Sequence, residues 1–315
     1  MRILLTGATG QLGASLRERL RADDVVAPTH AELDLADPRK IAAVVRDLCP
    51  HLILNTAAYT AVDQAETNTE ASHVLNAEAP GALARAAAAN GAAVIHYSTD
   101  YVFNGSKPTP YEESDPTDPL NVYGRSKLAG EAAVAASGAP HVIFRVCWLY
   151  SRIRSNFLLT MLRLGRSQAT IAVVNDQTGS PTSAAVIADA TVEVLRLGRA
   201  DLPAFLARNG GIFHLACQGH ATWFEFAEAI FAEARAAGLP LNVRDVRPIS
   251  TAEFPRPARR PSNSRLDLRR VTRQFGIQPQ HWRDALHEEV RAVRFATEQK
   301  PAETSAKAPS QPGSQ

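Results

Sequence analysis

The sequence predicts an α/β protein with a Rossmann-like, doubly wound parallel sheet and a smaller, interleaved C-terminal domain. Three observations predict it. Short apolar runs alternate with helical stretches over the first 150 residues, as in βαβ units. A glycine-rich segment follows the first expected strand directly. Hydrophobic residues make up 45% and charged residues 21% of the 315 residues, which is typical of globular proteins and excludes wholesale disorder.

Each expected element of the first half has a local reason. The strands are short apolar runs, and the helices between them have the length that a parallel crossover requires. Residues 71–90 are so rich in alanine that helix propensity alone favours a helix. Prolines among acidic and small residues indicate a loop at 103–119. The expected strands are 2–6, 24–27, 51–55, 92–98 and 141–146, and the expected helices are 11–21, 38–48, 71–90 and 122–137.

The second half is less regular. Prolines and arginines predict an extended, cationic loop at 248–261, and the last residues, 297–315, lack an apolar period and are expected to be a disordered tail. The expected helices here are 156–164, 184–197 and 223–237, and the expected strand is 212–216. We predict a first domain at 1–150, to which 184–217 returns, and a second domain formed by 151–183 and 218–296.

Composition excludes several classes of protein. The net charge is +2 and no dense basic block accompanies aromatic residues, so we expect no nucleic-acid partner. Cys49, Cys147 and Cys217 form no CxxC pair, which argues against disulfides and zinc and favours a reducing cytoplasm. A secretion signal and an 18-residue apolar stretch are both missing from the sequence, so we expect no export and no membrane span.

The segment from Thr6 to Gly13 predicts a dinucleotide site. Gly7, Gly10 and Gly13 are spaced three residues apart between a strand and a helix. Glycine at the turn can take a positive φ, and glycine at the helix start lets the backbone N–H groups approach a pyrophosphate.

The choice between NADH and NADPH stays open. The end of the second strand, residues 28–30, holds neither the acid that usually receives the adenosine ribose nor an arginine. Asp34 follows shortly afterwards. It either approaches the adenine ring or caps the helix that begins at Pro38.

Tyr123 and Lys127 form a candidate proton-transfer pair. They lie four positions apart, so they share one face of the expected helix 122–137. A nearby cation favours phenolate and lets a phenol donate its proton. Thr99 adds a hydroxyl at the carboxyl end of the preceding strand, the edge at which open α/β sheets bind ligands.

Taken together, the glycine loop, Thr99 and Tyr-x-x-x-Lys resemble the extended short-chain dehydrogenase/reductase superfamily. Within it, residues 1–293 resemble the dTDP-4-dehydrorhamnose reductase family. The most specific segments are NTAAYTAVD at 55–63, HYSTDYVF at 96–103, PLNVYG at 119–124, NDQ at 175–177 and RPSNS at 260–264.

The resemblance implies NADPH- or NADH-dependent reduction of the C4 keto group of dTDP-6-deoxy-L-lyxo-4-hexulose to dTDP-L-rhamnose, with the second domain as the substrate domain. It implies that Tyr123 donates the proton, that Lys127 holds the nicotinamide ribose, and that Thr99 bonds the sugar oxygen. The implied substrate contacts are Thr99, Asp100 and Trp148. Arg260, with Arg256 and Arg259, is expected to bind the substrate's diphosphate, because guanidinium groups match phosphate oxygens in a bidentate fork; the alternative is a solvated loop. The implied cofactor contacts are Gly7, Gly10, Gln11, Leu12, Gly13, Asp34, Leu35, Ala58, Tyr59, Thr60, Tyr123 and Lys127.

One position departs from the family. Some members form dimers through a magnesium ion held by glutamates, one of them at the position of Ser15 here. A neutral hydroxyl is a poor replacement for a carboxylate ligand. We therefore expect no metal site and a monomer or weak homodimer.

Two alternatives remain. A related nucleotide-sugar epimerase, reductase or 4,6-dehydratase shares the fold, but such dehydratases carry Asp-Glu after the catalytic threonine, where this chain has Asp100 and Tyr101. A non-catalytic regulatory subunit that binds the cofactor should have lost Tyr123 or Lys127, and both are present.

Overall fold

A six-stranded parallel sheet organises the chain, whose computed structural model describes residues 1–298. The strand order is β10-β5-β4-β3-β1-β2, so the order reverses beside β1, and ligands of doubly wound sheets bind at such a reversal. The predicted fold class is confirmed. The strands are β1 Arg2–Thr6, β2 Asp24–Val26, β3 Leu52–Asn55, β4 Ala93–Thr99, β5 His141–Val146 and β10 Gly211–His214.

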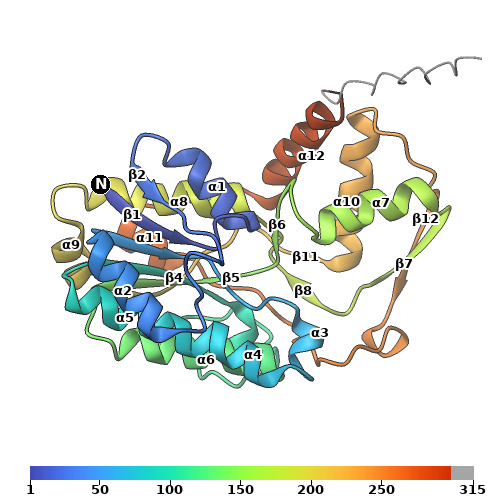
Figure 1. The fold of residues 1–315 in the computed structure, drawn as a ribbon. Coiled ribbons are helices and arrows are strands. Elements are labelled where there is room, and N and C mark those ends of the chain that lie inside the picture. Colours follow the sequence, from blue (N-terminus) through green and yellow to red (C-terminus); the bar gives the residue numbers. More distant parts are fainter. Residues whose placement is uncertain (299–315) are drawn as a thin grey trace, which may run out of the picture.

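Helices cover both faces of this sheet (Figure 1). One face packs against α1 Gln11–Arg19, α8 Ala184–Leu197, α9 Leu202–Asn209 and α11 Arg269–Phe275. The other face carries α2 Pro38–Leu48, α5 Ala79–Ala89 and α6 Val122–Ala135. Two separate cores result, because each face of a parallel sheet is apolar and must be covered.

A smaller body with its own apolar core lies beside the sheet, to the right in Figure 1. Its helices are α7 Phe157–Ser167, α10 Trp223–Ala236 and α12 Trp282–Glu298. Three short pairs of strands complete it: β7 Thr170–Val174 with β12 Asp245–Ile249, β8 Thr178–Gly179 with β11 Ala221–Thr222, and β6 Leu149–Tyr150 with β9 Thr182–Ser183.

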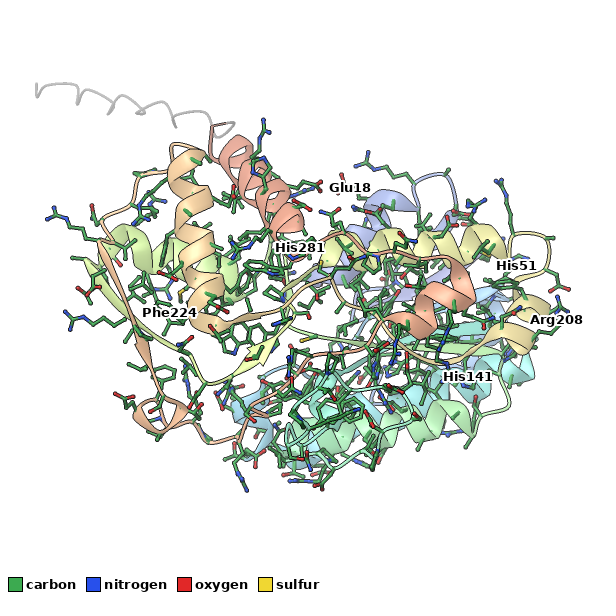
Figure 2. All side chains as sticks on the ribbon, turned by 180° about the vertical axis from the view of Figure 1, so that it is seen from behind. Glu18, His51, His141, Arg208, Phe224 and His281 are labelled. Carbon is green, nitrogen blue, oxygen red and sulfur yellow. The ribbon has the colours of Figure 1, made fainter. Side chains whose placement is uncertain are left out.

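The carboxyl ends of the sheet strands face this smaller body. His51 and His141 mark the amino ends of β3 and β5, and Figure 2 shows both at the far end of the sheet, whereas Phe224 lies in the smaller body. Residues that follow the strands therefore lie between the two bodies. In residues 1–298, no helix has the length and apolar character that crossing a membrane requires.

Several boundaries differ from the sequence prediction. The expected helix 71–90 is three pieces: α4 Thr69–His73, a π-helical turn at Val74–Glu78 and α5. Pro80 has no N–H to donate to the carbonyl of Asn76, so the regular ladder breaks there. A short helix, α3 Val62–Ala65, precedes α4. Within the expected loop 248–261, Pro248 belongs to the edge strand β12 and Thr251–Glu253 form a 3-10 turn.

The domain division stays a prediction, with one observation that bears on it. Val271 and Phe275 of α11 pack in the core of the sheet although they lie in the segment 218–296 that was assigned to the second domain. The predicted tail, 297–315, lies outside the described residues except for Thr297 and Glu298, which belong to α12 rather than to a tail.

Candidate active site

The glycine loop has the geometry that the sequence predicts. Gly7 has a φ of +68°, and a Cβ there would lie 2.6 Å from the backbone nitrogen of Ala57. A Cβ on Gly13 would lie 2.2 Å from the carbonyl oxygen of Gly7, so only glycine lets α1 begin this close to the strand. Gly10 is the N-cap of α1 and offers no side-chain cap, which leaves the first N–H groups of the helix available to an anion.

The end of β3 is held by a residue that the sequence analysis missed. Asn76, in the π-helical turn, accepts a hydrogen bond from the Tyr59 N–H (2.8 Å) and donates one to the Tyr59 carbonyl (3.0 Å). Its Nδ2 also lies 3.0 Å from Ser126 Oγ on α6. Asn76 thus ties the segment Ala58–Thr60 to the helix that carries Tyr123; a buried asparagine in an alanine-rich helix was the available signal.

Asp34 does not cap a helix. Its Oδ1 accepts a hydrogen bond from the Ala36 N–H, whereas Asp37, directly before Pro38, accepts from Arg39 and Lys40 and caps α2. The capping alternative for Asp34 is wrong, because Asp37 stands at the position that precedes the first turn. The adenosine alternative stays a prediction.

Thr99, Tyr123 and Asp100 meet at the carboxyl end of β4. Asn121 caps α6 by accepting from the Gly124 N–H, which places Tyr123 in the first turn of the helix. Gly124 lets that turn approach the 3-10 turn Asp100–Val102 that follows β4, since a Cβ on Gly124 would lie 2.3 Å from the Tyr101 carbonyl oxygen. Thr99 Oγ1 donates to Asp100 Oδ1 at 3.1 Å.

The pKa of Tyr123 is shifted in the direction opposite to the expected one. Withdrawal from water raises the pKa of Tyr123 to about 12, and a hydrogen bond with Thr99 only opposes the rise. The expected lowering by Lys127 is not seen, because the Lys127 ammonium is turned to the Tyr97 carbonyl at 2.6 Å. Burial also lowers the pKa of Lys127 to about 8, an effect that Glu131 opposes.

Asp100 is buried, and desolvation raises its pKa to about 7 although hydrogen bonds from Ser264 and Thr99 oppose the rise. A carboxyl group in this state can donate as well as accept a hydrogen bond near neutral pH.

The Trp148 ring lies directly against Gly179 of β8. Its φ of +44° is unusual for a bulky residue, and its ring stacks on Trp223 with centroids 3.5 Å apart. A Cβ on Gly179 would lie 2.4 Å from the Trp148 ring, so glycine is required beneath it. The Trp223 Nε1–H donates to Gln177. Trp223 was not among the predicted site residues.

Arg260 is already paired. Its Nη1 and Nη2 each lie 3.0 Å from an oxygen of Asp63, and Nη1 also donates to the Ala258 carbonyl. The predicted contact with a diphosphate therefore competes with an existing bidentate ion pair.

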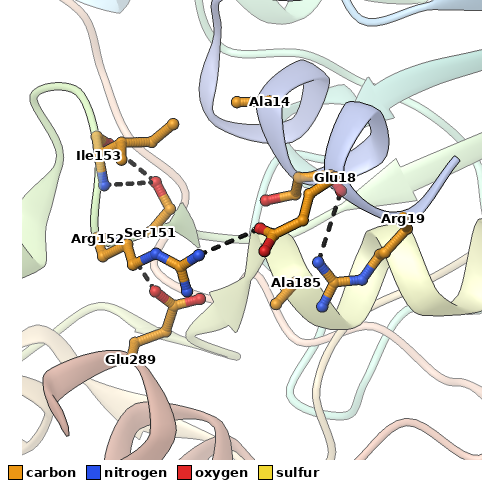
Figure 3. Close-up of a pocket in the computed structure, with 9 residues that line it drawn as sticks. Ala14, Glu18, Arg19, Ser151, Arg152, Ile153, Ala185 and Glu289 are labelled. Atoms are coloured by element: carbon orange, nitrogen blue, oxygen red, sulfur yellow. Dashed lines mark hydrogen bonds and ion pairs between the residues drawn. The ribbon is translucent and has the colours of Figure 1, made fainter. Parts of the chain in front are cut away.

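A pocket beside α1 is lined by Ala14, Ser15, Glu18, Arg152 and Glu289, among others (Figure 3). Its carboxylates have partners: Glu18 pairs with Arg152 at 3.1 Å, and Glu289 accepts from the Arg152 N–H and from Ser183 Oγ. Among the described residues, no group of three or more His, Cys, Asp or Glu side chains is placed to hold a metal ion.

Comparison with known proteins identifies the family. The family model described as RmlD substrate binding domain matches residues 1–295. A dTDP-4-dehydrorhamnose reductase of Escherichia coli (strain K12) is 42% identical over 290 residues, which cover 90% of this chain and 94% of that protein.

Solved structures agree. A dTDP-4-dehydrorhamnose reductase from Clostridium acetobutylicum superposes with a TM-score of 0.86 at 34% identity and covers 93% of this chain and 100% of that one. One from Bacillus anthracis, in complex with NADP, has a TM-score of 0.82 at 37% identity and covers 91% of this chain and 98% of that one. The chain therefore belongs to the RmlD substrate binding domain family, alongside the dTDP-4-dehydrorhamnose reductases.

Proposed function

We propose that this chain is an NAD(P)H-dependent reductase that converts the C4 keto group of dTDP-6-deoxy-L-lyxo-4-hexulose to the hydroxyl of dTDP-L-rhamnose. The observation that carries the proposal is the meeting of the Thr99 and Tyr123 hydroxyls at the carboxyl end of β4. It occurs in a chain whose relatives are named dTDP-4-dehydrorhamnose reductases.

The residues around the glycine loop fit a dinucleotide. Side chains at Gly7 and Gly13 would collide with backbone, and the uncapped start of α1 leaves the N–H groups of Gln11 and Leu12 for a pyrophosphate. The Gly10 N–H donates to the Gly7 carbonyl, so we infer that Gly10 contacts the pyrophosphate by the close approach of its backbone. The bound nicotinamide supplies the hydride. We infer that Asp34 and Leu35 contact the adenosine end and that Ala58, Tyr59 and Thr60 lie beside the ribose.

Tyr123 is suited to proton donation. With a pKa of about 12 the phenol is protonated at neutral pH, so it can protonate the oxygen at C4 as the carbonyl is reduced. Thr99 bonds the same oxygen and orients it. We infer that the Lys127 ammonium binds the nicotinamide ribose.

We infer that Asp100 and Trp148 contact the sugar nucleotide. The Asp100 carboxyl adjoins Thr99, and Trp148 presents an aromatic surface backed by Trp223. Arg260 reaches the diphosphate only by sharing its guanidinium with Asp63.

We further infer that the enzyme is cytoplasmic and acts as a monomer or weak homodimer. We infer that it binds no nucleic acid, because its net charge is only +2.

The test is an assay of the purified full chain with the 4-keto sugar nucleotide. Loss of nicotinamide absorbance is followed with NADPH and with NADH separately, and the product is identified by NMR. The expected result is cofactor oxidation with formation of dTDP-L-rhamnose. Oxidation of neither cofactor, or a product with the opposite configuration at C4, would contradict the proposal.

A further inference from the structure

A row of four buried polar side chains crosses the sheet and ends at Lys127. Thr6, Asn55 and His96 are direct cross-strand partners on β1, β3 and β4, so their side chains share one face of the sheet. Thr6 Oγ1 lies 2.7 Å from Asn55 Oδ1, Asn55 Nδ2 lies 3.1 Å from His96 Nδ1, and His96 Nε2 lies 3.5 Å from Lys127 Nζ.

The proposed reaction does not by itself explain this row. All four side chains are buried, and a buried polar group costs free energy unless it is hydrogen-bonded. Apolar residues next to them in the same strands, such as Leu54 and Ile95, already supply the ordinary core of the sheet. Three further polar residues behind Lys127 therefore require a reason beyond packing.

The row can be hydrogen-bonded in two directions. A neutral imidazole has one N–H donor and one acceptor nitrogen, and an amide can present either its oxygen or its NH2 to a neighbour. In the structure Thr6 Oγ1 donates to Asn55 Oδ1 and the Asn55 NH2 faces His96 Nδ1, which is the direction with His96 Nε2–H turned toward Lys127. When Lys127 is charged it can only donate, so His96 Nε2 must accept. A half-turn of the Asn55 amide then lets His96 Nδ1–H donate to the Asn55 oxygen and the Asn55 NH2 donate to Thr6. When Lys127 is neutral its nitrogen can accept, and every bond of the row can reverse.

We propose that His96 is a positioning residue for Lys127: its Nε2 accepts a hydrogen bond from the charged ammonium and donates one to the neutral amine, so the Thr6–Asn55–His96 row follows the charge of Lys127. The inference rests on the proposed function only for the part that Lys127 plays toward the cofactor. An ammonium has three N–H groups. The Tyr97 carbonyl and His96 take two of them, which leaves one for the ribose.

The charges around Lys127 suit a neutral acceptor at this place. Glu131, one turn further along α6, is held by Arg145 of β5 (2.7 Å) and by Ser98 of β4, so its negative charge is shared with a cation. Tyr123 on α6 is protonated near neutral pH. Burial and the charge of Lys127 hold the pKa of His96 well below its usual range, so His96 stays a neutral imidazole.

The first experiment observes the row directly and needs no substrate. Histidine in the full chain is labelled with 15N, and long-range 1H–15N spectra are recorded from about pH 6 to about pH 10, which spans the lowered pKa of Lys127. We expect His96 to stay neutral and to change from the Nδ1–H to the Nε2–H tautomer as Lys127 loses its proton. Lys127→Met should abolish the change. A His96 tautomer that stays the same in the unmutated protein would overturn the proposal.

The second experiment separates positioning from mere structure. NADPH affinity is measured against pH by nicotinamide fluorescence in His96→Leu and His96→Gln. Loss of a hydrogen bond to a charged group should move the alkaline fall in affinity toward lower pH by about one unit in His96→Leu. His96→Gln, whose amide oxygen can accept, should restore it. A purely structural role would weaken binding equally at every pH, and an alkaline fall that does not move would overturn the proposal.

His214→Leu is the matched control. His214 is also buried in a strand of the same sheet, β10, but its Nδ1 faces the Tyr111 carbonyl rather than Lys127. We expect its pH dependence to equal that of the unmutated chain. If the unmutated chain fails to reduce the 4-keto sugar, the proposed function fails, whereas the tautomer measurement still tests the row.

Discussion

The Tyr123 phenol is protonated at neutral pH, and withdrawal from water raises its pKa further, to about 12. Tyr123→Phe keeps the ring and its edge-to-face contact with Tyr101 but loses the hydroxyl. We expect turnover to fall by a factor on the order of 10² or more, the usual range for a general acid, with NADPH affinity nearly unchanged. Steady-state kinetics and fluorescence titration measure both. Tyr111→Phe, whose hydroxyl bonds Asn104, is the control, and near-normal turnover of Tyr123→Phe would refute the assignment.

Asp100 predicts a pH-dependent stability. Its pKa is raised from 3.8 to about 7, so the folded state favours the protonated form, and this stabilisation is lost as the pH rises through about 7. Asp100→Asn cannot ionise and should melt a few degrees above the unmutated chain at about pH 8, with a smaller gap at about pH 5. Lys127 titrates in both proteins, so its contribution cancels. Calorimetry at the two pH values measures this difference in melting temperature. A difference that is larger at the lower pH would be inconsistent with a buried, neutral Asp100.

The sequence could predict those site residues that lie within a few positions of one another, because local backbone geometry then fixes their relative placement. Gly7, Gly10 and Gly13 act within one turn, and Tyr123 and Lys127 lie on one helix face, so spacing alone identified them. His96 and Asn76 were not predicted as site residues, because the hydrogen-bond partners of a buried polar residue lie far along the chain and cannot be identified from local sequence. Asn55 lies 41 residues from His96, and Asp63 lies 197 residues from Arg260.

At the scale of elements, the π-helical turn holds the segment beside the cofactor site, so we expect that removing its Asn76 side chain weakens cofactor binding. Asn76→Ala removes both hydrogen bonds to Tyr59 and the link to Ser126 and leaves the Tyr59 backbone groups without these partners. We expect NADPH affinity to fall by about tenfold, as for the loss of about 1.4 kcal/mol. Asn90→Ala is the control, because Asn90 donates only to the Ala86 carbonyl at the end of α5. Equal losses of NADPH affinity in the two variants would argue against a role of Asn76 in positioning the Tyr59 backbone.

The first-half elements were predicted to within a few residues because each strand is a continuous apolar run and each crossover helix fills a definite gap. The helix 71–90 was divided differently, where Pro80 breaks the ladder, and the short helix α3 was not predicted. In the second half, two-residue strands such as β8 and β11 carry no pattern of their own. Their pairing depends on contacts between Thr178–Gly179 and Ala221–Thr222, which no local signal predicts.

At the scale of the whole molecule, the surface around Ser15 determines what is expected of assembly. A hard cation gives up its water shell only where several free carboxylates converge. Here Ser15 donates its hydroxyl to the Gln11 carbonyl, Asp189 pairs with Arg19, and Glu289 accepts from Ser183. Glu18 pairs with Arg152 (Figure 3). The surface therefore lacks the free negative charge that a bridging magnesium ion would need.

We accordingly expect EDTA to change neither the sedimentation coefficient nor the reductase rate, and the protein to be mostly monomeric in dilute solution. Tyr123 can protonate the reduced carbonyl without a metal, so activity and metal should be uncoupled even if a cation binds weakly elsewhere. Analytical ultracentrifugation in magnesium and in EDTA, with the rate measured on the same samples, is the test. A dimer that dissociates only in EDTA would show that the paired carboxylates around Ser15 rearrange to hold a metal ion between two copies.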